Sequence, residues 1–518
     1  MSAINYFDRG VLLYKDREAL VSDEGAYTYQ ELKEASIRVA AGIISRGDHD
    51  LTRLAVYSPN TIHVFPCLLG AMRAGNVLVP ANARDEVTAT VHFLNLTNTK
   101  WFFYHSSLSE NVARIREEVP SLEHFVCLDK DNNDDKSLQR FMAEEGGGEV
   151  PDIQHDPHRH FYYYATGGTT GFSKAVIWDN LVWDTFISLF NGQTPTDEPP
   201  VHLCVAPISH TAGPIGMALF PVGVKNVVLP GFDPLEVMKN IEEHRVTHLF
   251  LPPTALYAML SHPEVRNFDY SSLKYFLVAA APVSPDKIKE AIEVFGPCLC
   301  QAFGQAEAPA CLTWMPPAKF LEAVSDPEKE HLLKSCGQPT LSMRVAIMDD
   351  DGNIVPNGER GEIVAQGNLL SVAYLDNPEA TEEMRKFGWH HTGDIGIMDD
   401  DGYIYIVDRK KDMIITGGFN VYPAETEATL LSHPSIQDAA VVGVPDEKWG
   451  EMVKAVVTLK NGHNATEEEL VEFCKKGLGS VKTPKSIEFW DALPRTAAGK
   501  ISRKDIRKQY WEGHERSV

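Results

Sequence analysis

The chain has 518 residues, of which 43% are hydrophobic and 23% are charged, an ordinary globular composition with enough apolar material for several domains. Lys and Arg total 48 against 72 Asp and Glu, so the formal net charge is −24. Nucleic acids and anionic membranes are bound by neutralising phosphates with basic side chains, so this charge argues against either partner. A small anionic ligand is still allowed, because it needs only a few local cations and amides.

The cysteine pattern and the N-terminus indicate the compartment. Eight cysteines in 518 residues are too sparse for a disulfide framework, and none forms a Cys-x-x-Cys motif. The first residues lack the layout of a signal peptide. The richest apolar stretch, 65–81, is interrupted by Arg73 and is too short for a membrane span. We therefore expect buried reduced thiols, no integral membrane segment and a cytoplasmic location.

The first part of the chain alternates helical patterns with short apolar runs. Apolar spacing predicts helices over 29–45 and 63–74, and strands over 53–57 and 77–80. Three further buried strands are predicted at 227–229, 248–251 and 275–278. Strands separated by helices are typical of a layered α/β domain with a parallel sheet.

The pattern changes after about residue 340, where β-rich runs surround two predicted hairpin turns, 349–352 and 399–402. Beyond them, strands are predicted at 403–407, 413–416, 439–444 and 454–459, and helices at 423–431 and 467–476. The fold class expected is therefore α/β, with a large N-terminal domain of layered α/β subdomains over 1–408. A small α+β domain is expected over 409–518.

Residues 164–174 read Tyr-Ala-Thr-Gly-Gly-Thr-Thr-Gly-Phe-Ser-Lys. Glycines let backbone N–H groups turn toward an anion, threonine hydroxyls add donors, and lysine adds charge. The segment is not a Walker A loop, because two residues separate its last glycine from the lysine. A triphosphate-binding loop is therefore predicted at Thr166, Gly167, Gly168, Thr169, Thr170, Gly171 and Lys174.

With this loop the sequence resembles the adenylate-forming superfamily: acyl-CoA synthetases, aryl-CoA ligases, firefly-type luciferases and the adenylation domains of peptide synthetases. The resemblance covers about residues 5–507, and further motifs follow in the family's order. Within the loop, Ser173 replaces the usual proline and Ala175 the usual glycine. The resemblance implies an AMP-forming ligase of the acyl-CoA synthetase or aryl-CoA ligase branch.

Two motifs resemble the family's adenine site. Residues 279–282 match the turn that packs against adenine, and residues 301–307 are similar to its aromatic-Gly-x-Thr-Glu motif. Phe303 would face the adenine and Glu307 would hold magnesium, while Ala306 replaces a threonine that donates near the α-phosphate. The nucleotide-binding residues so implied are Ala280, Ala281, Pro282, Phe303, Gly304, Gln305 and Ala306.

The ribose site and the hinge are implied further along the chain. Residues 389–394 resemble Trp-x-x-Thr-Gly-Asp, in which Asp394 would accept hydrogen bonds from both ribose hydroxyls. The run 408–412 resembles the domain hinge, where Arg409 would reach the nucleotide and Lys411 would be the pivot.

The CoA tunnel and the catalytic lysine complete the motifs of the small domain. Gly417 and Gly418 match the loop that lines the pantetheine tunnel. Lys500, at the end of Pro-Arg-Thr-Ala-Ala-Gly-Lys, matches the catalytic lysine that bridges the substrate carboxylate and the ATP phosphates. The catalytic residues implied by the resemblance are His210, Glu307 and Lys500.

Residues 207–213, Pro-Ile-Ser-His-Thr-Ala-Gly, resemble the segment whose histidine or aromatic residue borders the acyl pocket. The pocket residues implied are Phe186, His210, Thr211, Ala212, Ala280, Ala302 and Cys311. Such a mixture of aromatic and small side chains suits an aryl, arylalkyl or medium-chain acid, and therefore fatty acid or aromatic acid metabolism.

The implied reaction joins a carboxylate to the α-phosphate of ATP and releases pyrophosphate, after which the thiol of coenzyme A displaces AMP. Its cofactors are ATP, Mg²⁺ and coenzyme A, and whether the chain forms a homodimer stays open. One alternative is a stand-alone adenylating enzyme that loads a carrier protein, although His210 stands where amino-acid activators usually offer aspartate. A luciferase-like oxygenase and a non-catalytic nucleotide-binding relative are the others, and retention of Lys174, Glu307 and Lys500 argues against the latter.

Overall fold

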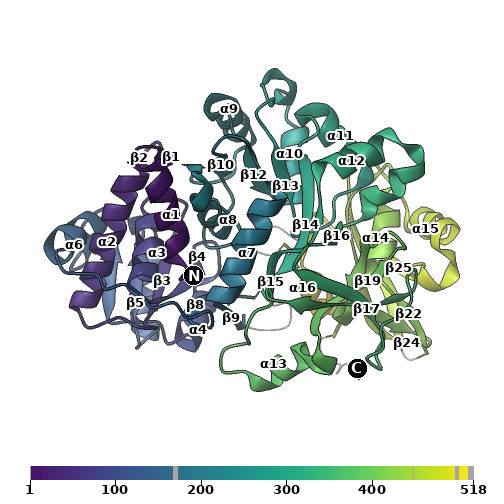
Figure 1. Cartoon of the computed structure of the whole chain (residues 1–518). Coiled ribbons are helices and arrows are strands. Elements are labelled where there is room, and N and C mark those ends of the chain that lie inside the picture. The colour runs from purple at the N-terminus through teal and green to yellow at the C-terminus, as the bar shows by residue number, and fades with distance from the viewer. Residues whose placement is uncertain (1, 167–172, 447, 496–500, 512–518) are drawn as a thin grey trace. The chain divides into compact units, whose positions relative to one another are not determined.

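A computed structural model describes residues 2–166, 173–446, 448–495 and 501–511 of the chain (Figure 1). By their internal contacts the described residues form two compact units. The large unit joins 2–166, 173–344 and 366–385, and the small unit joins 345–365, 386–446, 448–495 and 501–511. The functional boundary predicted between residues 408 and 409 falls inside the small unit and stays a prediction.

The first sheet of the large unit has seven strands in the order β7-β6-β5-β3-β4-β8-β9. They are β3 (Arg53–Ser58), β4 (Val77–Asn82), β5 (Trp101–Tyr104), β6 (His124–Cys127), β7 (Lys136–Ser137), β8 (His160–Ala165) and β9 (Ala175–Asp179). The strand β9 runs antiparallel to β8, and the other pairings are parallel. The parallel strands β4 and β5 are wholly buried, which explains their near-continuous apolar runs.

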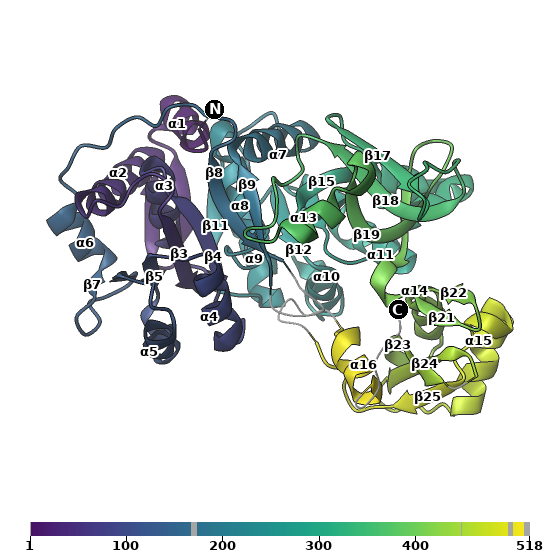
Figure 2. The same cartoon turned by 90° about the horizontal axis from the view of Figure 1, so that it is seen from below.

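Helices cover both faces of this sheet. They are α2 (Tyr29–Ser45), α3 (Val64–Arg73), α4 (Val87–Leu96), α5 (Ser109–Glu118) and α6 (Leu138–Glu145), while α1 (Ile4–Tyr14) packs on α2 and α3. Figure 2 shows α2 and α3 on one face of β3, β4 and β5, with α4 and α5 on the other. The helix α2 begins at its predicted residue because Thr28 and Glu31 form a capping box there.

The second sheet of the large unit has nine strands in the order β16-β15-β14-β13-β12-β10-β11-β1-β2. They are β1 (Glu18–Ser22), β2 (Gly25–Thr28), β10 (Val201–Cys204), β11 (Lys225–Val228), β12 (His248–Leu251), β13 (Tyr275–Val278), β14 (Leu299–Gln305), β15 (Ala308–Met315) and β16 (Gln338–Pro339). The strands from β11 to β14 run parallel, so their carboxyl ends meet at one edge, where open α/β sheets usually bind ligands.

The remaining helices of the large unit pack around this second sheet or follow it along the chain. They are α7 (Asn180–Gln193), α8 (Ala212–Ala218), α9 (Pro234–His244), α10 (Pro253–Leu260), α11 (Pro285–Phe295), α12 (Pro317–Ser325) and α13 (Pro378–Met384). The helix α7 contacts β15, and α8 and α9 both contact β10.

An antiparallel sheet, β17-β18-β19-β20, lies mostly in the small unit, and a five-stranded sheet follows it. The strands are β17 (Met343–Met348), β18 (Arg360–Gly367), β19 (His390–Met398), β20 (Ile404–Arg409), β21 (Ile414–Thr416), β22 (Phe419–Val421), β23 (Ile436–Asp446), β24 (Gly450–Leu459) and β25 (Ser486–Phe489). Three helices accompany the five-stranded sheet: α14 (Pro423–Leu431), α15 (Glu467–Lys482) and α16 (Arg503–Trp511).

Successive side chains of β23 point to opposite faces of the five-stranded sheet, so each face has its own apolar cluster. Val441 lies in one apolar cluster with Leu430 of α14 and Leu470 of α15. Val442 points to the opposite face and lies in a second cluster with Ile506 of α16. This two-residue period places α14 and α15 on one face of the sheet and α16 on the other.

The expected fold class is confirmed: layered α/β sheets form the large part of the chain, and a separate α+β arrangement forms its C-terminal part. The predicted bounds of α2, β12, β13 and α14 are those observed. The turn predicted at 399–402 joins β19 to β20. Residues 349–352 also form a turn, but it is followed only by an isolated bridge from Met348 to Ile354.

All eight cysteines lie among the described residues, are buried and form no disulfide. Within the described ranges, no helix is long and apolar enough to cross a bilayer.

Candidate active site

The two ends of the predicted phosphate loop are joined at its base. The backbone N–H of Lys174 donates to Oγ1 of Thr166 at 3.1 Å, and the N–H of Thr166 donates to the carbonyl oxygen of Lys174 at 3.0 Å. The antiparallel ladder of β8 and β9 leads into this closure. The predicted loop residues Gly167, Gly168, Thr169, Thr170 and Gly171 lie outside the described residues.

Beside the loop, Lys174, Tyr374 and Glu307 lie in a chain of contacts. Nζ of Lys174 lies 4.6 Å from the centre of the Tyr374 ring, and the Tyr374 hydroxyl donates to Oε1 of Glu307 at 2.5 Å. Burial, and next the charge of Glu307, raise the pKa of Tyr374 well above its ordinary value, so the hydroxyl remains a donor. The sequence reasoning missed Tyr374, which lies in an irregular segment that no motif marks.

The segment that carries Tyr374 is held against β9 by main-chain pairing. The N–H of Val372 donates to the carbonyl of Ile177 at 2.9 Å, and the N–H of Leu375 donates to that of Ala175 at 2.8 Å. This pairing adds the segment that carries Tyr374 to the edge of the first sheet, alongside β9, the strand that follows Lys174. It explains how a tyrosine 200 residues downstream of Lys174 reaches the lysine side chain.

Glu307 sits in the tight turn between β14 and β15, and its residue is only 9% exposed. Its carbonyl oxygen accepts from the N–H of Ser371 at 2.7 Å, and the neighbouring carbonyl of Ala306 accepts from Nε1 of Trp178 at 2.7 Å. Both bonds attach this turn to the first sheet, so they fix the Glu307 carboxylate relative to Lys174. The substitution of threonine by Ala306 thus leaves the main chain at this position anchored.

The adenine turn and the aromatic motif lie at the carboxyl ends of β13 and along β14. Ala280 adopts φ of +77°, a left-handed conformation that is costly for any residue with a Cβ. At Gly304 an added Cβ would stand 2.5 Å from the backbone nitrogen of Ala310, so only glycine fits there. Phe303 is buried on β14, and Val278 pairs with Gln301 across β13 and β14. The parallel register therefore brings the two predicted adenine-binding segments to one sheet edge.

The loop that carries His210 is fixed by Asn60. Nδ2 of Asn60 donates to the carbonyls of Val205 and Ala206 at 3.1 and 3.0 Å, and Oδ1 accepts from the N–H of Ile208 at 2.9 Å. The ring centre of His210 lies 6.0 Å from that of Tyr164, in an edge-to-face arrangement.

Burial sets the charge of His210. It lowers the pKa of the imidazole, and the nearby carboxylate of Asp85 opposes that shift only in part. His210 is therefore neutral at neutral pH.

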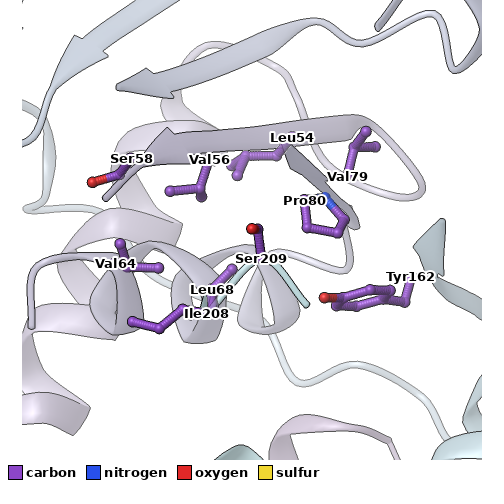
Figure 3. A pocket seen from close by; sticks show the side chains of 10 residues that line it. All are labelled: Leu54, Val56, Ser58, Val64, Leu68, Val79, Pro80, Tyr162, Ile208 and Ser209. Atoms are coloured by element: carbon purple, nitrogen blue, oxygen red, sulfur yellow. The ribbon is translucent and has the colours of Figure 1, made fainter. Parts of the chain in front are cut away.

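A small apolar cavity of about 20 Å³ lies behind the His210 loop (Figure 3). Side chains from β3, β4, α3 and β8 surround it, together with Ile208 and Ser209 from the loop. A volume of this size holds about one water molecule, whereas ligand pockets typically exceed a few hundred Å³. This cavity is therefore not the acyl site.

The predicted acyl-pocket residues come from elements that pack on each other. Phe186 of α7 packs on the ring of Phe190, and Phe190 packs edge-to-face on Trp314 of β15, with ring centres 5.7 and 6.1 Å apart. Cys311 lies on the same strand, β15, and Ala302 on its antiparallel neighbour β14. The described side chains Phe186, Ala212, Ala302 and Cys311 are buried, and Thr211 is half-buried.

Within the small unit, Asp394 and Arg409 form an ion pair. They are register partners on β19 and β20, and Nε of Arg409 lies 2.8 Å from Oδ1 of Asp394. Just before Asp394, at Gly393 of β19, the backbone has φ of +69°, and Oε1 of Glu362 accepts from the N–H of this glycine at 3.0 Å. Glu362 is buried and also accepts from Nδ1 of His391 and from Nζ of Lys410, at 3.0 and 3.1 Å. No motif had singled out Glu362.

The remaining predicted residues of the small unit lie in turns. Lys411 is the middle residue of a short 3₁₀ turn, Lys410–Asp412, directly after β20. Gly417 and Gly418 form the β21–β22 turn with φ of +57° and +83°, values that favour glycine. Lys500 lies outside the described residues, while an isolated bridge pairs Arg495 with Ile501 on its two sides.

The comparisons with known proteins match these features. The family model described as AMP-binding enzyme matches residues 7–375, and the model described as AMP-binding enzyme C-terminal domain matches residues 425–500. The chain belongs to this family, the adenylate-forming enzymes.

Relatives narrow the class. A medium/long-chain-fatty-acid–CoA ligase, FadD8 of Mycobacterium tuberculosis, is 41% identical over 68% of this chain and 62% of its own length, so under two thirds of that protein is matched. A feruloyl-CoA synthase of Amycolatopsis sp. is 34% identical over 94% of both chains. The crystal structure of ATP-bound MatB from Rhodopseudomonas palustris has a TM-score of 0.88 at 25% identity, over 99% of this chain and 100% of that one. The protein is an enzyme of the AMP-forming acid–CoA ligase class, which uses ATP and coenzyme A.

Proposed function

We propose that this ligase activates an aryl, arylalkyl or medium-chain carboxylic acid and transfers its acyl group to coenzyme A. FadD8 is named for medium- and long-chain fatty acids and the Amycolatopsis relative for feruloyl-CoA, whose acyl group is aromatic, and both names support this range. The apolar and aromatic side chains around Phe186 and Cys311 support it further, since they offer no charged partner for a polar tail.

The contact chain from Lys174 through Tyr374 to Glu307 is the observation that carries the proposal. A carboxylate is a poor electrophile, because its leaving group would be oxide. Attack by the carboxylate on the α-phosphorus of ATP creates an acyl-adenylate, whose AMP group leaves readily. Such an in-line displacement requires positioned cations and donors more than covalent chemistry by the protein. A lysine, a tyrosine hydroxyl and a buried carboxylate at the base of a glycine-rich loop supply that environment.

The donor set around Glu307 fits a magnesium ion. Mg²⁺ prefers one or two carboxylates together with phosphate oxygens and waters. Glu307 offers one carboxylate, of which Oε1 is oriented by Tyr374, and the described residues hold no cluster of three acidic, histidine or cysteine side chains that would form a protein-only site. When bound, the ion would neutralise phosphate charge, and Glu307 would be its protein ligand.

Asp394 and Arg409 are the proposed nucleotide contacts of the small unit. The carboxylate of Asp394 would accept from the ribose hydroxyls, while Arg409, paired with it, would reach the nucleotide. Phe303, Ala280 and the neighbouring residues of their two motifs would receive the adenine at the carboxyl edge of the second sheet.

The second half-reaction is proposed to follow a rotation of the C-terminal domain, residues 409–518, about Lys411. The rotation would withdraw the catalytic Lys500 and bring in Gly417 and Gly418, whose lack of side chains leaves room for a pantetheine arm. Lys411→Pro should trap the adenylating pose, so the variant should form acyl-adenylate but little thioester. Normal overall turnover of that variant would count against the hinge.

The proposed function is tested by screening carboxylic acids for pyrophosphate release, and by repeating each hit with and without CoA. We expect release that depends on the acid, and stoichiometric thioester and AMP when CoA is present. AMP accumulation without thioester would contradict CoA as the acceptor and favour loading of a carrier protein. Binding of ATP without pyrophosphate release for any acid would favour a non-catalytic relative. The cytoplasmic location remains a prediction, and whether the chain forms a homodimer stays open.

A further inference from the structure

Asp408 directly precedes the proposed pivot region, and three hydrogen bonds hold its buried carboxylate in place. Its side chain is 2% exposed. One carboxylate oxygen accepts from Nη1 of Arg503 at 2.7 Å and from the N–H of Arg409 at 2.8 Å, and the other accepts from the N–H of Ala424 at 2.6 Å. Asp408 lies on β20, whereas Ala424 and Arg503 lie near the starts of α14 and α16, which follow the pivot in sequence.

Arg503 is the centre of this cluster. Besides Asp408, the same Nη1 lies 3.2 Å from Oδ2 of Asp412, and Nε and Nη2 make a bidentate pair with Glu427 at 2.8 and 2.5 Å. Guanidinium groups suit such forked pairing because their donors are planar and fixed. Arg503 thus binds a carboxylate that precedes Lys411 and two that follow it.

A second polar contact joins the antiparallel sheet to the elements that follow Lys411. Nη2 of Arg360, on β18, pairs with Oε1 of Glu425 at 2.7 Å, and its guanidinium lies 4.7 Å from the ring centre of Tyr422. Both Glu425 and Tyr422 belong to the start of α14. The small unit therefore holds two charged contacts between its antiparallel sheet and the elements beyond the pivot.

We propose that the Asp408–Arg503 pair is a positioning latch for the two-step reaction: it holds the segment that carries Lys500 in one of the two poses of the hinge. Arg503 follows Lys500 by three residues, so holding Arg503 in place limits where the lysine can lie. The latch rests on the proposed rotation about Lys411. That rotation would carry Arg503, Asp412 and Glu427 together and leave Asp408 behind on β20.

The energetic consequence follows from burial. Bonds inside the rotating part persist, whereas those from Asp408 to Arg503 and to the N–H of Ala424 must break. Breaking them forfeits charge-assisted hydrogen bonds from the Asp408 carboxylate that water replaces only in part, so the latch favours the pose of this structure and sets how often the other is visited. A charged hydrogen bond of this kind corresponds to a change in the balance of the two poses of about ten- to a hundredfold.

The matched pair Asp408→Asn and Asp412→Asn tests the latch. Both substitutions remove one carboxylate charge from the same Arg503 nitrogen and keep the side-chain shape, but only Asp408 lies across the pivot. Two rates are measured for each: acid-dependent pyrophosphate release in the absence of CoA, and thioester formation from a supplied acyl-adenylate. We expect Asp408→Asn to change the ratio of the two rates by about ten- to a hundredfold, and Asp412→Asn to leave the ratio within about twofold of the wild type.

An unchanged ratio in Asp408→Asn, or an equal change in both variants, would overturn the latch, because a merely structural role lowers both rates together. Should Asp408→Asn fail to fold, Arg360→Gln provides the second variant, since it removes the other contact across the boundary. The wild type is measured first. If it forms no acyl-adenylate or no thioester, the proposed function fails, whereas an active wild type with unaltered ratios in the variants contradicts only the latch.

Discussion

The hydroxyl of Tyr374 donates a 2.5 Å hydrogen bond to the carboxylate of Glu307, across 67 residues of chain. The bond joins a segment paired with β9 to the turn between β14 and β15, so it connects the two sheets of the large unit at the base of the phosphate loop. One face of the same ring is covered by the ammonium group of Lys174. Orientation of the proposed metal ligand therefore depends on a residue outside every motif.

Replacing Tyr374 by Phe should weaken ATP use and keep the fold. The ring that contacts Lys174 is retained, but Glu307 loses a charged hydrogen bond, so kcat/KM for ATP should fall about tenfold or more. Steady-state kinetics with magnesium varied at fixed ATP is the measurement, and the apparent magnesium requirement should rise. Tyr104→Phe is the control, because its hydroxyl also donates to a carboxylate, that of Asp135, at 2.8 Å. Equal losses in both variants would contradict a specific role for Tyr374.

Lys500→Ala should separate the two half-reactions. A positive charge between the substrate carboxylate and the ATP phosphates is needed only while the adenylate forms, so adenylation should be lost. Thioester formation from a supplied acyl-adenylate should continue at close to the wild-type rate. Rapid-quench assays of each half-reaction measure this. Acyl-adenylate formation by the variant at the wild-type rate would show that the lysine is not the catalytic one.

Two buried histidines should make the fold acid-sensitive. His202 and His248 face each other across β10 and β12, and burial lowers the pKa of His202 to about 4 and that of His248 to about 3. Nδ1 of His202 lies 2.8 Å from Oδ1 of Asn226, while Nε2 has no hydrogen-bond partner among the described residues. A proton added to Nε2 would therefore be a buried, unsolvated charge.

The sign of the effect follows from the two states. The unfolded chain takes up protons near pH 6.5 and the folded chain only well below it, so the stabilisation is complete above about pH 6.5. It should fade as the pH falls, by about 3 kcal/mol at pH 4 for His202 alone. Denaturant titrations at several pH values should show a shallower acid decline in His202→Gln than in the wild type. The exposed His463→Gln is the control, and identical acid declines in the wild type and His202→Gln would refute the assignment.

The strained backbone at Ala280 predicts a stabilising substitution in the adenine turn. With φ of +77°, an alanine there costs about 1 kcal/mol more than a glycine would. Ala280→Gly should therefore raise the free energy of unfolding, measured by chemical denaturation. Ala281→Gly, at a neighbour without positive φ, should lower it by a similar amount because glycine gains more entropy on unfolding. A destabilised Ala280→Gly would mean that the turn is not strained.

Local chemistry explains which elements could be predicted. The helix over 29–45 has its own capping box, and the strand at 248–251 is a short apolar run that ends at Pro252 and Pro253, so each is determined by residues close in sequence. The nucleotide motifs could likewise be recognised from the sequence, because a glycine-threonine loop that ends in lysine has few other uses.

Contacts between distant segments could not be predicted. Tyr374 meets Glu307, and Arg503 meets Asp408 across 95 residues, only because strand pairing and helix packing bring those segments together. Glu362 was missed for a related reason: a lone glutamate on a strand is ordinarily exposed, and its burial and its bond to the N–H of Gly393 arise only where β18 pairs with β19. The acyl pocket was implied only as a set of side chains, and its shape depends on the packing of α7 against β15.

The central claim is that the carboxylate itself attacks the α-phosphorus and that AMP carries the transferred oxygen away. A substrate acid labelled in both carboxylate oxygens with a heavy oxygen isotope tests this directly, with the AMP, pyrophosphate and thioester analysed by mass spectrometry. One labelled oxygen should appear in AMP and one should remain in the thioester carbonyl, because the thiol expels AMP together with the bridging oxygen. Unlabelled AMP, or label in inorganic phosphate or pyrophosphate, would contradict an acyl-adenylate intermediate and with it the proposed two-step reaction.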